Sequence, residues 1–127
     1  MSARRPPRVL LVDDHEPLLR AWRRLFSFSC EIVGAVRTGG AALAAVTASE
    51  PDVVVLDHLL PDANALDLCP RIMALAPNTR VVIVTASRDA NLPSAANQAG
   101  AFAVVDKLGP DVDLELVIQR AYAEAAQ

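Results

Sequence analysis

The stretch from Leu10 to Leu19, LLVDDHEPLL, contains the two features that decide the fold. An apolar run ends in two adjacent carboxylates, Asp13 and Asp14, and apolar residues then resume at helical spacing. The run is typical of a buried strand, and the segment after it is typical of an amphipathic helix. Because adjacent carboxylates repel each other, we expect this pair either to lie in water or to share a cation.

Four further apolar runs repeat the pattern along the chain. The five predicted strands are RVLLV (8–12), EIVGAV (31–36), DVVVLD (52–57), RVVIVT (80–85) and AFAVVD (101–106). Three of them are unbroken and rich in valine, as expected of strands that are buried on both faces of a parallel sheet. The sequence therefore predicts five βα units, with helices on both faces of the sheet.

The segments between the predicted strands have helical spacing. The first, EPLLRAWRRLF, places its apolar residues on one stripe, which consists of Leu18, Leu19, Trp22, Leu25 and Phe26. Pro77 and Gly100 are expected to end two later helices. Pro70 falls inside the third helical segment, where a proline would either delay the start of the helix or kink it.

Length and composition indicate a single globular domain. Of the 127 residues, 53% are apolar and 21% are charged, enough to bury an aliphatic core. The net charge of −3 argues against binding of nucleic acid through its phosphates. Cys30 and Cys69 form no pairing motif, which suits free thiols in a reducing cytosol. We expect one domain over 1–127 with a flexible tail over 1–7, in a cytoplasmic protein without a membrane span.

Polar residues follow the predicted strands at their carboxyl ends. In an open parallel sheet, ligands bind beyond these ends, near the point where the strand order reverses. If the order is 2-1-3-4-5, Asp13, Asp14 and Asp57 converge there and make an oxygen-rich site that suits Mg²⁺. Thr85 and Lys107 would add a hydroxyl and a positive charge. This arrangement is able to hold a phosphoryl group against a metal ion.

Four fragments carry a resemblance to a known family. In order, LLVDDHE, VVVLDHLLPD, VIVTA and GAFAVVDK resemble the receiver domain of two-component response regulators of the chemotaxis-regulator type, and the resemblance covers essentially the whole chain. It implies a flavodoxin-like α/β fold, a (βα)5 three-layer sandwich with a parallel sheet in the order 2-1-3-4-5. Such domains take part in phosphorelay signal transduction.

The resemblance also implies the roles of the acidic residues. Asp57 would accept a phosphoryl group from the phosphohistidine of a sensor histidine kinase or a phosphotransfer protein. Asp13, Asp14, Asp57 and the backbone carbonyl of Leu59 would hold Mg²⁺. The two adjacent aspartates are thus expected to be metal ligands.

Two further residues complete the site that the resemblance implies. Lys107 would offset the negative charge, and Thr85 would hydrogen-bond a phosphoryl oxygen and draw its loop inward. The change would be relayed through the face formed by the fourth helix, fifth strand and fifth helix to an output domain, a target protein or a second copy of the chain. Such a protein is a switch and not a turnover enzyme, although it assists its own phosphorylation and undergoes slow autodephosphorylation. Leu59 is apolar and would not orient an attacking water.

Three positions depart from the pattern of that family. Val104 stands where an aromatic residue often swings inward together with the threonine. Ala65 replaces a glycine after the acceptor loop, and Leu108 replaces a proline, as in the branch that often precedes a helix-turn-helix domain. Val104 leaves an alternative open: a receiver-like interaction domain that no longer switches on phosphorylation.

Other polar residues near the site have simpler interpretations. His15 is expected to be exposed and not to bind metal. Because alternate strand residues face opposite ways, His58 is expected to be partly exposed and to point away from the site. Arg20, Arg23 and Arg24 form a basic face that is either simply solvated or, by resemblance to receivers, docks the kinase.

Rival functions on the same fold lack their sequence signatures. A nucleotide binder would need a G-x-G-x-x-G or Walker sequence, and the chain has neither. A cobalamin-binding module would share the D-x-H of DDHEPL, but Leu18 stands in place of the expected glycine. A haloacid-type phosphatase would need a second aspartate at the position of Leu59.

Overall fold

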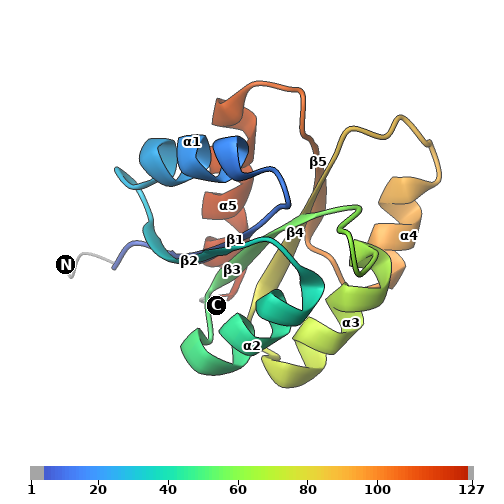
Figure 1. Cartoon of the computed structure of the whole chain (residues 1–127), viewed down its shortest axis with the longest axis horizontal. Helices are drawn as coiled ribbons and strands as arrows, with labels where there is room; N and C mark the ends of the chain where they lie inside the picture. Colours follow the sequence, from blue (N-terminus) through green and yellow to red (C-terminus); the bar gives the residue numbers. More distant parts are fainter. Residues whose placement is uncertain (1–4, 126–127) are drawn as a thin grey trace.

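The computed structural model describes residues 5–125 as five strands alternating with five helices (Figure 1). The strands are β1 (Arg8–Val12), β2 (Glu31–Val36), β3 (Val53–Asp57), β4 (Arg80–Thr85) and β5 (Ala103–Asp106). The helices are α1 (Glu16–Phe26), α2 (Gly39–Ser49), α3 (Ala65–Leu75), α4 (Leu92–Gln98) and α5 (Asp111–Ala125). The predicted βα units are therefore confirmed, with β3 and β5 slightly shorter than expected.

The strands form one parallel sheet in the order β2-β1-β3-β4-β5, as predicted for a flavodoxin-like fold. The three unbroken, valine-rich runs form the central strands β1, β3 and β4, whose residues are almost all buried. The edge strands β2 and β5 are mostly half-buried. The order puts the carboxyl ends of β1 and β3 side by side, with those of β4 and β5 next along the edge.

Each face of the sheet has its own apolar core. Helices α1 and α5 cover one face, and α2, α3 and α4 lie against the other (Figure 1). From α1, Leu19, Trp22 and Phe26 are buried in the α1/α5 core, which confirms most of the predicted stripe. Leu25 of the same stripe is 45% exposed.

The helix ends largely follow the sequence signals. Helix α3 begins at Ala65, where the side chain of Asn64 caps it, and it continues through Pro70. A delayed helix start caused by Pro70 was therefore the wrong alternative. Pro77 follows the end of α3, as expected. Gly100 adopts a φ of +99° just after α4, a conformation that a residue with a Cβ rarely adopts.

The N-terminal segment contacts the rest of the domain from Arg5 onward. The Arg5 guanidinium lies 2.8 Å from the Asp52 carboxylate, and the Arg5 carbonyl accepts a hydrogen bond from the Tyr122 hydroxyl. Residues 1–4 of the predicted tail lie outside the described residues. Within residues 5–125, none of the helices is both long enough and apolar enough to cross a membrane.

Both cysteines are buried free thiols, as the sequence predicted. Burial raises the pKa of the Cys69 thiol to about 11 and also raises that of Cys30. A thiolate is the reactive form of cysteine, so neither group is a candidate nucleophile. The polar residues at the carboxyl edge of the sheet remain the candidates for chemistry.

Candidate functional site

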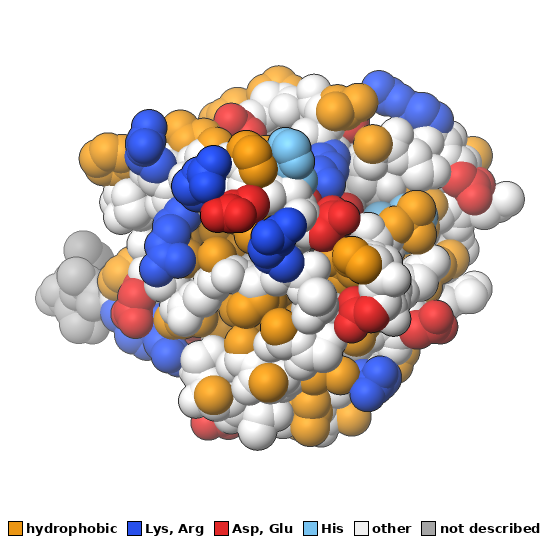
Figure 2. All heavy atoms as spheres, viewed as in Figure 1, with side chains coloured by type: hydrophobic (Ala, Val, Ile, Leu, Met, Phe, Trp, Pro, Cys, Tyr) orange, Lys and Arg blue, Asp and Glu red, His pale blue; other side chains and the backbone are white. Residues whose placement is uncertain are grey.

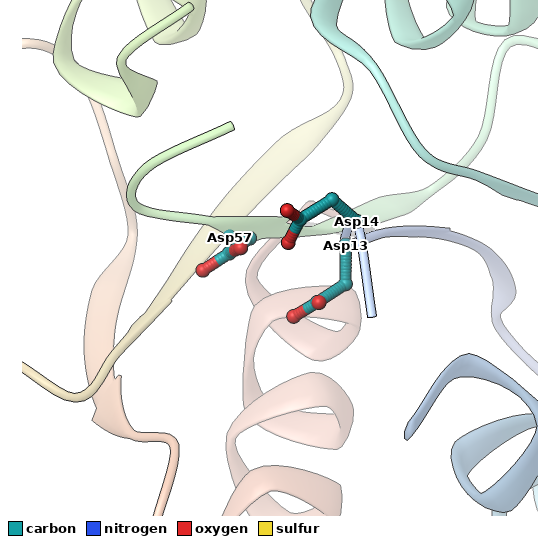
Figure 3. Close-up of side chains that lie close together, drawn as sticks. All are labelled: Asp13, Asp14 and Asp57. Carbon is teal, nitrogen blue, oxygen red and sulfur yellow. The ribbon is translucent and has the colours of Figure 1, made fainter. Parts of the chain in front are cut away.

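Three carboxylates converge at the adjacent ends of β1 and β3. Asp13 and Asp14 directly follow β1, and Asp57 is the last residue of β3. One oxygen atom from each carboxylate lies within 4.8 Å of the other two, and Figure 3 shows the three side chains grouped at this edge. Asp13 is fully buried and Asp57 is 6% exposed, whereas Asp14 is exposed. The predicted convergence of these residues is therefore found in the structure.

Backbone contacts orient the Asp13 carboxylate. The Asp13 N–H donates to the Val36 carbonyl of β2 at 3.1 Å and so extends the ladder beyond β1. The His15 N–H donates to Asp13 Oδ1 at 2.8 Å, and the Arg37 guanidinium donates to the Asp14 carbonyl at 3.1 Å. His15 is exposed and acts here through its backbone. The turn after β1 thus leaves Asp13 Oδ2 as the inward-facing acceptor.

Lys107 supplies a positive charge to this cluster. Its Nζ lies 2.7 Å from Asp13 Oδ2 and 3.3 Å from Asp57 Oδ1. Its backbone N–H donates to the Thr85 carbonyl at 2.8 Å, which continues the pairing of β4 with β5 and fixes the base of the side chain. One ammonium group therefore contacts two of the three carboxylates, and the cluster retains a negative charge.

The pKa values of the buried groups respond to this charge balance. Burial, followed by the charge of Asp13, raises the pKa of Asp57, and Lys107 opposes this rise. Burial alone would lower the pKa of Lys107, but the contact with Asp13 and the charge of Asp57 outweigh it and raise that pKa. Lys107 therefore stays positively charged, while Asp57 gives up its proton less readily than an exposed aspartate.

The donor set fits a hard divalent cation. All three side-chain donors are carboxylate oxygens, which are the ligands that Mg²⁺ prefers. Asp13 Oδ2 is buried, and within residues 5–125 it has no hydrogen-bond partner of good geometry, although the Lys107 ammonium lies against it. A buried anionic oxygen of this kind is stabilised by a cation. The residues present are therefore suited to magnesium.

An open pocket gives access to the cluster. Asp57, Thr85 and Lys107 line it together with Leu59 and Ala86. The Leu59 side chain is 63% exposed and offers the pocket no polar group. The side chains that the sequence predicted as flanking the acceptor therefore share one solvent-accessible space with it.

His58 and Thr85 alternate with Asp57 and Val84 along their strands, although Asp57, His58 and Thr85 all line the open pocket at this edge of the sheet. Asp57 pairs with Val84, and the His58 N–H donates to the Val84 carbonyl at 2.9 Å, so that His58 stands opposite Thr85. His58 Nδ1 lies 3.0 Å from Thr85 Oγ1. His58 is half-buried, as predicted, but it lines the pocket together with Asp57, and its contact with Thr85 was missed. The contact could have been predicted from the pairing of β3 with β4, because paired residues of neighbouring parallel strands face the same way.

Two positions that depart from the family pattern are accommodated by the core. Val104 is half-buried and packs against the core under α2, α3 and α4. Ala65, the first residue of α3, is buried in the same core. Neither residue is among those that line the pocket at the carboxylate cluster.

Comparison with known proteins matches this arrangement to a family. The family model of the response regulator receiver domain matches residues 9–119, which include all three clustered aspartates, Thr85 and Lys107. The chain belongs to the response regulator receiver domain family. Receiver domains bind Mg²⁺ at an acidic site and interact with histidine kinases and output domains, and most of them are not enzymes.

Individual relatives agree with this assignment. The DNA-binding transcriptional activator DevR/DosR of Mycobacterium tuberculosis is 36% identical over 109 residues, which cover 83% of this chain and 50% of the activator. A protein-glutamate methylesterase/protein-glutamine glutaminase of Myxococcus xanthus is 36% identical over 110 residues, which cover 84% of this chain and 32% of that protein. This receiver domain thus spans about half the length of the first relative and about a third of the second.

Solved structures of receivers share the fold. A two-component response regulator of the LuxR family from an Aurantimonas species superimposes with a TM-score of 0.88 at 26% identity, over 94% of this chain and 87% of that one. The signal receiver domain of the putative response regulator NarL from Mycobacterium tuberculosis gives a TM-score of 0.82 at 28% identity, over 97% of this chain and 98% of that one. The flavodoxin-like fold is therefore that of a receiver over nearly its whole length.

Proposed function

We propose that this receiver domain accepts a phosphoryl group on Asp57 from the phosphohistidine of a sensor histidine kinase or a phosphotransfer protein. One observation carries the proposal: the buried Asp57 carboxylate faces an open pocket while two further carboxylates and an ammonium group surround it. Burial and the charge of Asp13 raise the pKa of Asp57, and an aspartate with a perturbed pKa in an open pocket is typical of a functional site.

Asp13, Asp14, Asp57 and the backbone carbonyl of Leu59 would hold Mg²⁺ in this domain. When bound, the ion supplies positive charge that neutralises the acceptor carboxylate and the phosphoryl oxygens. The hydrogen bond from the His15 N–H holds Asp13 in the orientation in which Oδ2 faces the cluster. Since Asp13 is buried, few water molecules would have to be displaced for it to act as a ligand.

The transfer needs little from the protein beyond positioning and charge. A carboxylate oxygen of Asp57 would attack the phosphorus atom, forming an O–P bond as the N–P bond breaks and the imidazole leaves with its electron pair. Lys107 would offset the charge on the carboxylate and the phosphoryl group, since its Nζ already lies 3.3 Å from Asp57. The domain would be a switch that assists its own phosphorylation and slow autodephosphorylation, not a turnover enzyme.

The kinase or phosphotransfer protein would dock beside the acidic pocket. Arg20 and Arg23 of α1, with Arg37 after β2, line a groove on this side together with Glu16, which pairs with Arg20 and Arg37. Figure 2 shows basic side chains gathered where α1 covers the molecule. Such a surface suits a partner with acidic side chains near its histidine. The domain would work in the cytoplasm, as its two free thiols suggest.

The phosphorylated state would be relayed through the α4-β5-α5 face to an output domain, a target protein or a second copy of the chain. Thr85 would hydrogen-bond the phosphoryl oxygen and draw in the loop that leads to α4. The outer surface of α5 carries two exposed apolar side chains, Val112 and Leu116, which are 57% and 52% exposed. Direct binding of nucleic acid by these residues is not part of the proposal, because the chain carries a net charge of −3.

Intact mass after incubation with acetyl phosphate and Mg²⁺ tests the proposal. Wild type is expected to gain one phosphoryl group, and Asp57→Asn and a chelator-treated sample are expected to gain none. Asp111→Asn changes an exposed aspartate at the start of α5 and should behave as wild type. A metal-independent adduct, or one that persists in Asp57→Asn, would contradict the assignment of the acceptor.

The comparisons do not favour the non-switching interaction domain, whose single ground is that Val104 has no aromatic ring. Beryllofluoride with Mg²⁺ separates the two functions. Changes in the backbone amide resonances of α4, β5 and α5 are expected if the domain switches. Changes confined to the pocket around Asp57 would favour the interaction domain.

A further inference from the structure

We infer that His58 is a positioning residue: its hydrogen bond to Thr85 holds the threonine hydroxyl on the face of the sheet opposite Asp57 and opposes the phosphorylated arrangement. The inference rests on the proposed function, because it concerns the step in which Thr85 contacts a phosphoryl group on Asp57. Nothing in the receiver signature requires a histidine at position 58, so this restraint would be a property of this chain.

The alternation of the strands places the two groups on different faces. In β3, Val53 and Val55 belong to the α1/α5 core, and Asp57 continues their side of the strand. Val54 and Leu56 belong to the opposite core, and His58 continues theirs. Thr85 likewise follows Ile83 on the His58 side. The Thr85 hydroxyl must therefore leave the His58 side to reach a phosphoryl group on Asp57.

The bonding capacity of the threonine hydroxyl makes the two contacts compete. The hydroxyl has one hydrogen and two lone pairs. The Ser87 N–H donates to Thr85 Oγ1 at 3.0 Å and uses one lone pair, and His58 Nδ1 lies at 3.0 Å as the second partner. Thr85 is 5% exposed, at the wall of the open pocket beside Asp57. Where Nδ1 accepts, the single hydroxyl hydrogen serves either His58 or a phosphoryl oxygen; where Nδ1 carries the hydrogen, the movement of Thr85 away from the histidine breaks the contact.

His58 is unable to follow the threonine because its backbone is fixed on both sides. Its N–H donates to the Val84 carbonyl at 2.9 Å, and its carbonyl accepts from the Ala65 N–H, the first residue of α3, at 2.8 Å. The Thr85 carbonyl also accepts a hydrogen bond, from the Lys107 N–H at 2.8 Å, but Thr85 is the last residue of β4 and leads into a loop of exposed residues from Ala86 to Asn91. We therefore expect Thr85 to move on phosphorylation and His58 to keep its position.

The expected effect follows from the strength of one neutral hydrogen bond. Removing it should shift the equilibrium between the two arrangements, and hence the affinity for a phosphoryl mimic, by about three- to tenfold. The direction is fixed: loss of the histidine nitrogen makes the domain easier to activate. This is opposite to the effect of damaging a catalytic group.

Beryllofluoride titrations in Mg²⁺ at fixed pH, followed by the amide resonances of the pocket, test the inference. His58→Leu keeps the bulk but removes Nδ1, and it should bind the mimic about three- to tenfold more tightly. His58→Asn places a polar atom close to the position of Nδ1 and should restore most of the wild-type affinity. In a Thr85→Ala background, His58→Leu should have no further effect, because the partner of the bond is already absent.

The imidazole resonances of His58 provide a second readout that a purely structural role would not move. On saturation with beryllofluoride, the Nδ1 resonance should move to its value in Thr85→Ala, since both states lack the bond. An unchanged Nδ1 resonance, or a His58→Leu effect that persists in Thr85→Ala, would overturn the inference while leaving the acceptor role of Asp57 intact. If wild type binds the mimic no better than Asp57→Asn does, the proposed function and the inference fall together.

Discussion

Lys107 Nζ lies 2.7 Å from Asp13 Oδ2, the buried oxygen that has no hydrogen-bond partner of good geometry among residues 5–125. The lysine thus supports the fold and not only the chemistry of the site. It also reaches Asp57 at 3.3 Å, so one side chain couples the end of β5 to the ends of both β1 and β3. Any substitution at this position will change stability and phosphorylation together, and the two effects have to be measured separately.

Lys107→Ala is expected to lower the free energy of unfolding by about 1–3 kcal/mol without metal, because it leaves two buried carboxylates without a counter-charge. Urea denaturation in a chelator checks this. Arg88→Ala is the matched control, since it removes an exposed ion pair with Asp106 and should change stability by less than about 1 kcal/mol. Equal losses of unfolding free energy in the two variants would show that the contacts of Lys107 with the buried carboxylates stabilise the fold no more than an exposed ion pair does.

Asp57→Asn is expected to raise the melting temperature in a chelator. Burial and the charge of Asp13 raise the pKa of Asp57, so its ionised form is unfavourable in the folded domain at neutral pH. Adding Mg²⁺ should stabilise wild type more than the variant and so reduce the difference. Thermal unfolding with and without Mg²⁺ measures both effects. An Asp57→Asn variant that is less stable than wild type in the chelator would contradict this account of the cluster.

Leu59→Asn is expected to shorten the lifetime of the phosphoryl group. The Leu59 side chain is 63% exposed in the pocket beside Asp57, where an amide is able to orient an attacking water and a leucine is not. The half-life of the radiolabelled phosphoprotein, compared with wild type, gives the result. Leu108→Asn, another exposed leucine that is not among the pocket residues, should leave the half-life unchanged. An unchanged half-life in Leu59→Asn would contradict the idea that the leucine slows hydrolysis because it does not orient water.

Asp62→Ala is expected to lower the midpoint of urea denaturation. The Asp62 carboxylate accepts hydrogen bonds from the Gly39 and Gly40 N–H groups at 2.8 and 3.1 Å, so it caps the start of α2 from the loop after β3. Asp62→Asn keeps one acceptor oxygen and should lie between the alanine variant and wild type. An alanine variant as stable as wild type would mean that water caps α2 equally well.

The contribution of Asp62 should also depend on pH. The Gly39 and Gly40 N–H groups lower its pKa below the ordinary 3.8, so the folded domain favours the ionised form. This stabilisation is present above pH 3.8 and is lost as the pH falls through the lower pKa of the folded domain. The difference in stability between wild type and Asp62→Ala should therefore be constant near neutral pH and shrink in acid. Denaturation curves of both proteins, recorded from neutral to acidic pH, check that this difference shrinks in acid.

Much of the fold and the site could be predicted from local sequence. Unbroken runs such as Val53–Asp57 indicate buried strands, and the apolar stripe of Glu16–Phe26 indicates a helix on the sheet, because both patterns depend only on spacing along the chain. With the strand order 2-1-3-4-5, the positions of Asp13, Asp14 and Asp57 at the carboxyl ends of neighbouring strands predict that they meet at one edge of the sheet. Pro70 was harder to interpret, since a cap at Asn64 and the packing of α3 allow a proline inside that helix.

The sequence by itself determined the order of the elements, the faces that they bury and the set of carboxylates that meet at one edge. Only the tertiary structure decided which charges and hydrogen bonds those groups share. The pairs Lys107–Asp13 and His58–Thr85 join residues from different βα units, at distances of 2.7 and 3.0 Å. Such contacts depend on strand register and on the rotamer that each side chain adopts in a packed environment. Patterns along the chain indicate which face a residue occupies, but the contact itself exists only once the strands have paired.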